Sequence, residues 1–310
     1  MRFLKSAVRV GLVLAAVSLP AWYFLVLHSP SPSTPGFTLD IEEIRALATA
    51  MPGRRANEVR VEKIATLQFA EAMVMAGEPW RATPIPVYSY QLIFPDSSII
   101  IDTAMADTKG IPDMMVTDFD ARALQRLNVA MTLAEQIVIT HEHFDHIGGL
   151  LEHPQLAELL PAVRLTDTQL AHPERMAPAL LPEDTMADYR PLQYDGAVAI
   201  APGVVLIEAA GHSPGSQMVY VLLASGTEIL FLGDVSWQLR NIKAVQERPL
   251  FMTALIREDR QAVINQFQSL NNLAREEPAL NLVPGHQLEP IAALVEQGVM
   301  RRGFRLNLAQ

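Results

Sequence analysis

The chain has 310 residues, of which half are hydrophobic and 19% are charged, so it can bury a sizeable core and cannot be wholly disordered. Its formal net charge is −10, and an acidic surface repels phosphate backbones, which argues against nucleic acid as a partner. There is no cysteine, so disulfides and cysteine nucleophiles are excluded, and any metal must be held by His, Asp or Glu.

A basic start and a long apolar run form the N-terminus. Three cationic residues come first: Arg2, Lys5 and Arg9. The run Val10–Leu27 follows, and its 18 uncharged residues would span roughly 27 Å as a helix, just enough for the core of a bilayer. Trp22 and Tyr23 stand near its outer end, where amphipathic rings favour the membrane interface. The pattern predicts a transmembrane anchor over residues 1–27, with the N-terminus in the cytoplasm.

This anchor places the rest of the chain outside the cytoplasm, on the periplasmic side in a bacterium. The alternative is a signal peptide, whose cleavage would release a secreted protein, although the run is long for that role and no clean A-x-A site follows it. Residues 28–36 are interpreted as a Pro/Ser linker that cannot continue a helix and reaches away from the membrane. One domain is predicted over residues 37–310.

The first part of this domain has a helix cap and a Met-rich stretch. Asp40, with an acidic residue three positions later, predicts the start of a short helix. The segment Ala70–Arg81 is rich in methionine, and Met73 and Met75 are interpreted as packing side chains, with a substrate-facing loop as the alternative. Two residues are then expected to break the chain: Pro84 and Pro86.

Short runs of β-branched and aromatic residues, bounded by turn residues, predict a succession of strands. These are expected at Val59–Phe69, Tyr88–Phe94, Ser98–Asp102, Leu133–Thr140, Val163–Thr166, Ala197–Ile200, Val204–Glu208, Met218–Leu223, Glu228–Leu232 and Ala279–Val283. Helices are expected from Asp118 or Asp120 to Leu127, and at Thr168–Met176, Ile256–Arg275 and Pro290–Gln297. Strands with helices interleaved and also clustered late predict an α+β fold in which helices cover the outer faces of sheets.

The segment with the strongest chemical signal is His141-Glu142-His143-Phe144-Asp145-His146, at the end of a predicted buried strand. Side chains alternate along an extended chain, so His141 and His143 point the same way, and Asp145 and His146 follow where the loop turns. Two such pairs on one loop suit two adjacent metal ions better than one. The pattern has a chance probability of roughly a few in ten thousand in a chain of this composition.

With this motif the sequence resembles the metallo-β-lactamase superfamily. Further segments typical of that family follow in order, each after a predicted strand: Gly211-His212-Ser213, Leu232-Gly233-Asp234 and Pro284-Gly285-His286. The resemblance extends from Tyr88 to His286. It implies an αβ/βα four-layer sandwich, with two sheets face to face and helices outside, preceded here by one hydrophobic N-terminal helix.

The resemblance also implies a dinuclear metal site with seven side-chain ligands. His141, His143 and His212 would hold the first metal, Asp145, His146 and His286 would hold the second, and Asp234 would bridge them. Nitrogen and oxygen donors suit two Zn²⁺ per chain and also permit iron or manganese. Glu142 occupies a variable position of the motif and is interpreted as a non-ligand. Three histidines match nothing and are interpreted as surface or linker residues: His28, His153 and His172.

The implied function is that of a metallo-hydrolase. Two divalent ions favour an anionic tetrahedral intermediate and provide a metal-bound hydroxide near neutral pH, which would attack a small ester, lactone, thioester or amide. Asp145 and Asp234 are the candidate catalytic carboxylates, and Asp234 can pass a proton to the leaving group. The alternative is a membrane-tethered protein of the same fold with redox chemistry, of the sulfur dioxygenase kind, or with a non-catalytic role.

Within the superfamily, the local resemblance is greatest to the N-acyl homoserine lactonases, through Gly211–Gln217 and Asp102–Met105. Those lactonases carry a Tyr shortly after the bridging Asp, where this chain has Trp237. An indole can donate one N–H and stack, but it cannot supply a phenol. Trp237 is therefore either a residue of the substrate pocket or a packing residue beneath the last helices.

Overall fold

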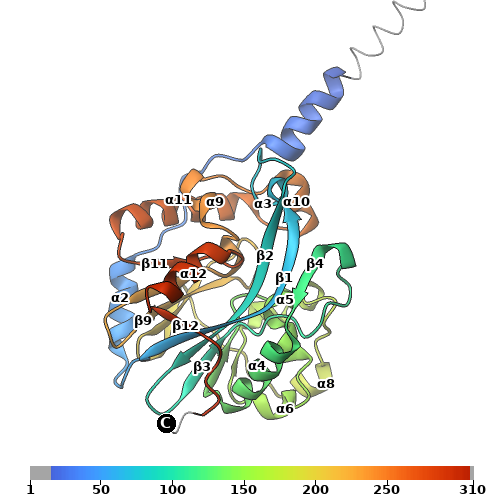
Figure 1. Cartoon of the computed structure of the whole chain (residues 1–310). Helices are drawn as coiled ribbons and strands as arrows, with labels where there is room; N and C mark the ends of the chain where they lie inside the picture. Colours follow the sequence, from blue (N-terminus) through green and yellow to red (C-terminus); the bar gives the residue numbers. More distant parts are fainter. Residues whose placement is uncertain (1–14, 308–310) are drawn as a thin grey trace, which may run out of the picture.

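Two β-sheets lie face to face, with helices on both outer faces (Figure 1). The computed structural model describes residues 15–307. The strands of the larger sheet are β1 (Glu58–Ala70), β2 (Ala82–Ile93), β3 (Ser98–Ile101), β4 (Val116–Phe119), β5 (Gln136–Val138), β6 (Val163–Arg164) and β12 (Met300–Arg302). Those of the smaller sheet are β7 (Ala197–Ala201), β8 (Val204–Glu208), β9 (Gln217–Leu222), β10 (Glu228–Phe231) and β11 (Asn281–Val283). Their orders are β12-β1-β2-β3-β5-β6, with β4 also paired to β1, and β11-β10-β9-β8-β7.

Alternation of side chains gives each sheet two apolar faces. In β3, Ile99 and Ile101 face the opposite sheet, whereas Ile100 faces the helices outside. In β8, Val204 points to the larger sheet and Val205 to the helices on the other side. Three cores result, one between the sheets and one beneath the helices on each outer face. The four-layer α+β sandwich expected from the sequence is confirmed.

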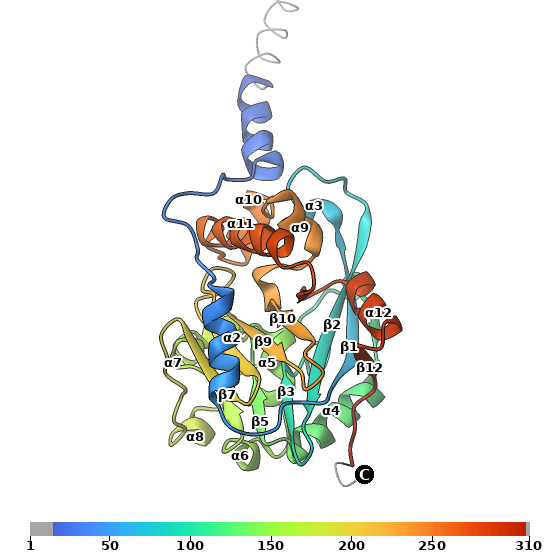
Figure 2. The ribbon, with the colours of Figure 1, turned by 90° about the vertical axis from the view of Figure 1, so that its left-hand side faces the viewer.

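The helices that cover the two faces come from different parts of the chain (Figure 2). The α-helices are α2 (Ile41–Ala50), α3 (Glu71–Val74), α4 (Ala121–Leu133), α5 (Phe144–Leu151), α6 (Leu156–Leu159), α7 (Asp167–Leu170), α8 (Glu183–Met186), α9 (Leu239–Ala244), α10 (Leu250–Leu255), α11 (Arg260–Glu276) and α12 (Leu288–Glu296). The short helices of other types are the π-helix η1 (Tyr23–Leu27) and the 3-10 helices η2 (Asp113–Met115), η3 (Pro173–Arg175) and η4 (Gly233–Val235). Buried residues of α4 and α5 pack on the larger sheet, and those of α2 and α11 pack on the smaller one.

The prediction that Pro84 and Pro86 break the chain is wrong, because both lie inside β2. They pair with β1 on one side, whereas β3 covers only Tyr90–Ile93 on the other side. Alternate residues of β2 therefore have their backbone nitrogens at an open edge of the sheet, where no neighbouring strand accepts an N–H. A proline at such a position removes no hydrogen bond between strands. The sequence also missed β4 and β12, which are short.

The Met-rich segment forms the end of the long β1–β2 hairpin and contains α3. Met75 is buried, and Met73 packs against the core beneath the helices of the larger sheet. The interpretation of both as packing side chains is confirmed. Neither lines the cavity at the functional site.

The N-terminal apolar segment is helical over residues 15–22, ends in η1 and projects from the end of the molecule that carries α3 and α10 (Figures 1 and 2). Over residues 15–307, no helix has both the length and the hydropathy needed to cross a bilayer. The predicted anchor includes residues 1–14, which lie outside the described residues. The anchor and the cleaved signal therefore both stay predictions.

The Pro/Ser segment at residues 28–36 is not helical, as the sequence predicted. It lies along α11, where the N–H of Ser33 donates to Oδ1 of Asn265 (2.8 Å) and Nε2 of Gln261 donates to the carbonyl of Ser31 (3.2 Å). Prolines prevent this segment from forming a helix, but the backbone groups of the residues between them remain free to bond to a neighbouring surface.

Candidate metal centre

Several loops meet at one edge of the sandwich, where strands of both sheets end. His141 follows β5, His212 lies between β8 and β9, Asp234 lies in η4 after β10, and His286 follows β11. β5 runs parallel to β3, and β10 runs parallel to β11, so the carboxyl ends of these strands bring the residues that follow them to the same edge. A Cβ on Gly285 would lie 2.3 Å from Oδ1 of Asp234, so only glycine permits this approach of the last two loops.

All seven side chains expected as ligands converge there. Among the described residues, three groups place one possible ligand atom of each member within 4.8 Å of the others: His141, His143 and His212; His141, His146 and Asp234; and Asp145, His146 and His286. Asp234 lies between them, with Oδ2 3.4 Å from Nε2 of His212 and Oδ1 3.0 Å from Nε2 of His286. The first and third groups are the trios that the resemblance implied, and the ligand roles of the seven side chains stay predictions.

The hydrogen bonds of His146 and His286 fix which ring nitrogens face the centre. Nδ1 of His146 lies 2.8 Å from Oδ2 of Asp102, and Nδ1 of His286 lies 2.8 Å from the carbonyl oxygen of Pro86. These oxygens can only accept, so both Nδ1 atoms donate, and in the neutral rings each Nε2 keeps a lone pair. The two Nε2 atoms are 3.4 Å apart, and both lie close to Oδ1 of Asp234. These two nitrogens and the carboxylate oxygen are three acceptor atoms that face one another, and such an arrangement suits a bound cation.

The other trio shows the same feature. Nδ1 of His212 lies 2.7 Å from Oε2 of Glu258, which leaves the lone pair of its Nε2 facing Nδ1 of His143 at 2.9 Å. Nε2 of His141 is buried and has no hydrogen-bond partner within the described part of the chain. A buried ring nitrogen without a partner, next to two other imidazoles, is costly unless a metal ion binds there.

The pKa shifts differ between the trios. Burial lowers the pKa of His141 well below its usual value and lowers the pKa values of His143 and His212 to about 3. Burial also disfavours the charged forms of His146 and His286, but Asp234 and its neighbouring carboxylates outweigh that effect and raise both pKa values. The first trio therefore offers unprotonated nitrogens at neutral pH, whereas metal binding at the second must displace protons.

Asp102 was identified from the sequence only as part of an early strand end, but its role is specific. Its backbone is left-handed (φ +58°), and its carboxylate accepts the N–H of Thr140 (2.6 Å), the Oγ1–H of Thr140 (2.8 Å) and the Nδ1–H of His146. A non-glycine residue at such a backbone angle stores strain of the kind found at functional sites. The sequence signal for this role of Asp102 was a lone acidic residue directly after the apolar strand β3.

A buried charged cluster contacts His212 and Asp234, and it was not predicted from the sequence. Arg248 and Glu247 are fully buried, and Glu258 is nearly so. Nη1 of Arg248 donates to Oε2 of Glu258 (2.9 Å), and its Nη2 donates to the backbone carbonyl of Asp234 (2.9 Å). Burial raises the pKa of Glu258 to about 7. Residues of both charges stand side by side at Glu247-Arg248 and again over residues 257–260, as is common on a solvated surface, so the sequence contained no signal of this burial.

Trp237 lines the cavity and also packs in the hydrophobic core beneath it, so its role as a residue of the substrate pocket stays a prediction. Its indole N–H donates to Oδ2 of Asp234 over 2.6 Å. The guanidinium of Arg248 lies 4.4 Å from the ring centroid, which adds a cation–π contact on its other side. The ring is 5% exposed, so this hydrogen bond is formed out of water.

Glu142 is turned away from the centre, as its interpretation as a non-ligand requires. Its carboxylate accepts the hydroxyl of Ser213 (2.8 Å) and the N–H of Gly215 (3.1 Å), and so connects two of the loops. None of the remaining histidines joins the cluster: His28, His153 and His172. The prediction that His153 is a surface residue is wrong, because it is buried, and its Nδ1 accepts the N–H of Gln155.

A cavity of about 380 Å³ opens over the cluster. Its walls are mostly apolar side chains from the β1–β2 hairpin, the start of α5, and α10: Leu67, Phe69, Ile85, Phe144, Met252 and Leu255. Charged groups lie among the lining residues, including Arg257 and Glu174. An apolar chamber with a polar cluster on its floor is typical of sites that bind small molecules.

The two facing sheets, with His and Asp residues converging where their strands end, define the class of the protein. The chain belongs to the metallo-beta-lactamase superfamily, whose profile matches residues 82–286. The match contains every residue of the cluster.

Curated relatives include lactonases. An N-acyl homoserine lactonase of Bacillus thuringiensis is 25% identical over 182 residues, which cover 53% of this chain and 70% of the relative. A probable metallo-hydrolase of Mycobacterium tuberculosis is 28% identical over 182 residues, which cover 53% of this chain and 56% of the relative. These are similarities of sequence over about half of the chain.

Solved structures agree on the fold. An N-acyl homoserine lactone hydrolase with the product N-hexanoyl-L-homoserine bound at its catalytic metal centre has a TM-score of 0.60 at 18% identity, over 77% of this chain and 96% of that one. A probable metal-dependent hydrolase from Staphylococcus aureus has a TM-score of 0.55 at 13% identity, over 75% and 90%. At these identities the likeness is one of fold.

Proposed function

We propose that the chain is a dinuclear metal-dependent hydrolase that cleaves a small ester, lactone, thioester or amide. The observation that carries this proposal is the convergence of acceptor atoms from His146, His286 and Asp234, beside the unpartnered nitrogen of His141. Seven nitrogen and oxygen donors suit two Zn²⁺ ions and also permit iron or manganese. When bound, two such ions polarise a carbonyl group and lower the pKa of water, so hydroxide is available at neutral pH.

In this proposal the two catalytic carboxylates have different tasks. Asp234 is enclosed, and Trp237 holds it in place between the trios. His286 and His146 keep its pKa well below the usual range against the effect of burial, so it is ionised at neutral pH; in this proposal it accepts a proton during the reaction and passes it to the leaving group. The side chain of Asp145 is 15% exposed and lines the cavity, so it is the carboxylate that a substrate meets.

The substrate class that we propose is a lactone or ester with an apolar acyl chain. The cavity has apolar walls above a polar floor, which matches a molecule with one reactive carbonyl group and one hydrocarbon tail. The relatives from Bacillus thuringiensis are N-acyl homoserine lactonases, and an N-acyl homoserine lactone has one reactive lactone carbonyl and one acyl chain. Thioesters of similar shape fit the same cavity and are the next class to test.

We also propose that residues 1–27 tether the enzyme to a membrane, with the catalytic domain outside the cytoplasm. The support is the basic start followed by the uncharged run Val10–Leu27. Secretion after signal cleavage is the alternative. Analysis of the N-terminus of the mature protein, together with fractionation of expressing cells, separates the two.

The test of the function combines metal content with turnover. The purified full chain is expected to bind two metal ions and to hydrolyse members of a panel of lactones, esters, thioesters and β-lactams. His143→Ala and Asp234→Asn should abolish hydrolysis while circular dichroism stays unchanged. His172→Ala, on the surface and outside the cluster, is the matched control. Bound metal without any turnover would favour the redox or non-catalytic alternative. Failure to bind metal would exclude the proposed hydrolase and this alternative alike.

A further inference from the structure

The apolar N-terminal helix is attached directly to the catalytic domain, without a flexible spacer. Val26 is buried, and its carbonyl accepts the N–H of Gly77 from the β1–β2 hairpin (3.2 Å). Oγ of Ser29 accepts the N–H of Glu247, the neighbour of Arg248 (2.9 Å). Because these contacts lie on both sides of the end of the helix, they fix the place where it leaves the domain.

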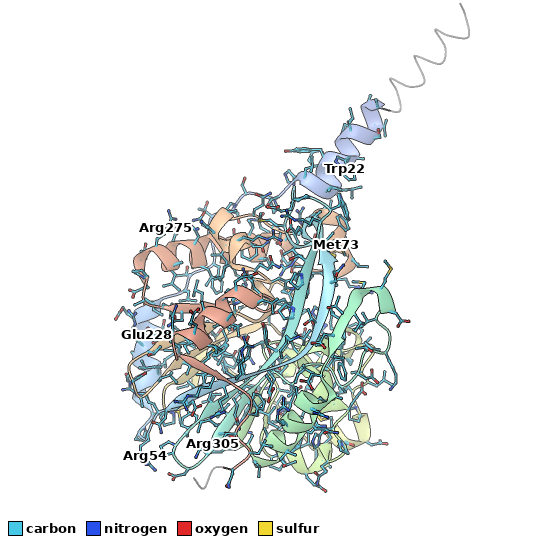
Figure 3. The ribbon with its side chains drawn as sticks, in the orientation of Figure 1. Trp22, Arg54, Met73, Glu228, Arg275 and Arg305 are labelled. Atoms are coloured by element: carbon cyan, nitrogen blue, oxygen red, sulfur yellow. The ribbon has the colours of Figure 1, made fainter. Side chains whose placement is uncertain are left out.

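A row of aromatic rings continues from the helix onto the domain. The ring of Trp22 lies 6.5 Å from that of Trp80, and Trp80 stacks on Phe251 at 5.8 Å with an interplanar angle of 21°. Trp22 and Trp80 remain 48% and 56% exposed. Figure 3 shows Trp22 at the same end of the molecule as Met73, which lies in the hairpin end that carries Trp80.

The opening of the cavity lies beside this row. Leu255 follows Phe251 by four residues on α10, which is about 6 Å along the helix axis. Leu255 is 71% exposed and also lines the cavity, so it stands at the cavity mouth. The cavity is also lined by Leu67 and Phe69, from the same hairpin whose end carries Trp80. The two elements that seat the apolar helix are thus also two walls of the cavity.

We propose that the mouth surface, formed by Trp22, Trp80, Phe251 and Leu255, lies on a lipid bilayer, and that the cavity takes its acyl substrate from the membrane. The inference rests on the proposed hydrolase function and narrows its substrate class. The preferred substrates are acyl compounds with a chain long enough to partition into lipid. Such a substrate enters with its hydrocarbon tail passing Leu255 and does not have to cross water.

A bilayer explains the pattern of exposure better than a second protein does. On the N-terminal helix, Val17, Leu19 and Phe24 are 68%, 66% and 53% exposed, so apolar side chains extend around it. A helix that is apolar all round is normally surrounded by protein or by lipid. Three residues before Val10 are basic (Arg2, Lys5 and Arg9), which matches anionic lipid headgroups, and tryptophan is the residue type that favours the interface.

The binding experiment uses the full chain reconstituted with vesicles of phosphatidylcholine and phosphatidylglycerol, with or without brominated acyl chains. Bromine quenches tryptophan fluorescence only over short distances, so Trp80 is quenched if the mouth surface touches the bilayer. Trp80→Phe should remove a clear part of the quenching, whereas Trp237 is enclosed and should contribute little. Trp80→Glu should weaken contact of the domain with lipid. Val129→Glu, on the exposed face of α4 at the other end of the molecule, is the matched control (Figure 1).

The activity experiment compares para-nitrophenyl butanoate, which stays in water, with para-nitrophenyl dodecanoate, which enters vesicles. Vesicles are expected to raise kcat/KM for the dodecanoate several-fold and to leave the butanoate unchanged. Trp80→Glu should remove this increase without altering turnover of the butanoate, because Trp80 does not line the cavity. Val129→Glu should behave like the unmodified chain.

Two results would overturn the inference. If the protein binds vesicles but Trp80 is not quenched, the domain stands away from the bilayer. If Trp80 is unquenched and the chain dimerises in a manner that Trp80→Glu prevents, the surface belongs to a second copy. Quenching of Trp80 without hydrolysis of any substrate is a separate outcome, because it supports the membrane surface and contradicts the proposed function alone.

Discussion

The indole N–H of Trp237 donates to Oδ2 of Asp234 over 2.6 Å, inside a site from which water is largely excluded. Arg248 holds both partners, since it lies over the indole ring and donates to the backbone carbonyl of Asp234. The aspartate shared by the two histidine trios is thus fixed through its side chain and through its main chain. An indole can only donate, so this contact favours the ionised form of Asp234, which is the stronger acceptor.

Trp237→Phe tests this contact, because it keeps an aromatic ring beside Arg248 and removes the N–H. A hydrogen bond to a charged group contributes about 1.5–3 kcal/mol, so kcat should fall roughly 10- to 100-fold, with a smaller change in KM. Steady-state kinetics on a short-chain ester measures both constants. Trp80→Phe is the control for loss of an indole outside the cavity. An unchanged kcat in Trp237→Phe would show that the indole only fills space.

Asp102→Asn should weaken metal binding by about 10- to 100-fold, as is typical when the partner of a metal-binding histidine is lost. An amide can turn its N–H₂ toward Nδ1 of His146, and the ring proton would then move to Nε2, where a lone pair is needed. Competition with a chromogenic chelator gives the affinities. Asp96→Asn is the matched control, since Asp96 is exposed and pairs with Arg54 at the surface. Equal affinities for the two variants would contradict the role of Asp102.

Arg248→Met should destabilise the fold by about 3–5 kcal/mol, because it leaves buried Glu247 and Glu258 without their cation. Urea unfolding of the metal-free protein measures the change. The control is Arg54→Met, which breaks an exposed pair with Asp96 and should cost about 1 kcal/mol or less. The double variant Arg248→Met/Glu258→Gln should recover part of the loss, and similar losses for the two arginines would contradict the role of the cluster.

The metal affinities of the two trios should depend differently on pH. A raised pKa keeps His146 and His286 protonated to a higher pH than an ordinary imidazole, so metal affinity of their trio rises as pH increases through that raised value. His143 and His212 have pKa values of about 3, so they are already neutral, and their trio should change little from about pH 6 to about pH 8. Chelator competition at several pH values resolves the two equivalents. Identical pH dependence for both would contradict this assignment.

Two truncations test the docking of the Pro/Ser segment. Removal of residues 1–27 should leave a soluble chain that hydrolyses water-soluble substrates, because the contacts of Ser31 and Ser33 with α11 remain. Removal of residues 1–36 loses these contacts and should lower the midpoint of thermal unfolding further, by about 2–4 °C for each kcal/mol lost. Calorimetry measures the difference. Equal midpoints would mean that the docked segment contributes nothing to stability.

The sequence, through its resemblance to the metallo-β-lactamase superfamily, was sufficient to predict the layers of the fold and the seven side chains that converge. Short apolar runs identify strands because the alternation is a local property of the chain, and the strands from residue 197 to residue 232 are confirmed. The motif at residues 141–146 is contiguous, and His212, Asp234 and His286 each follow an identifiable strand. These signals lie in neighbouring residues, so they can be recognised without knowing how the chain folds.

Only the tertiary structure decided what surrounds that cluster. Glu258, Arg248 and Trp237 are far from the motif in the chain, and burial turns a segment with the charge pattern of a surface into a support for His212 and Asp234. Likewise, the prolines of β2 are tolerated only because β3 is too short to cover that edge. A residue's partners depend on packing between distant segments, whereas its tendency to form a strand or a loop depends on its neighbours, and only the latter is visible in one sequence.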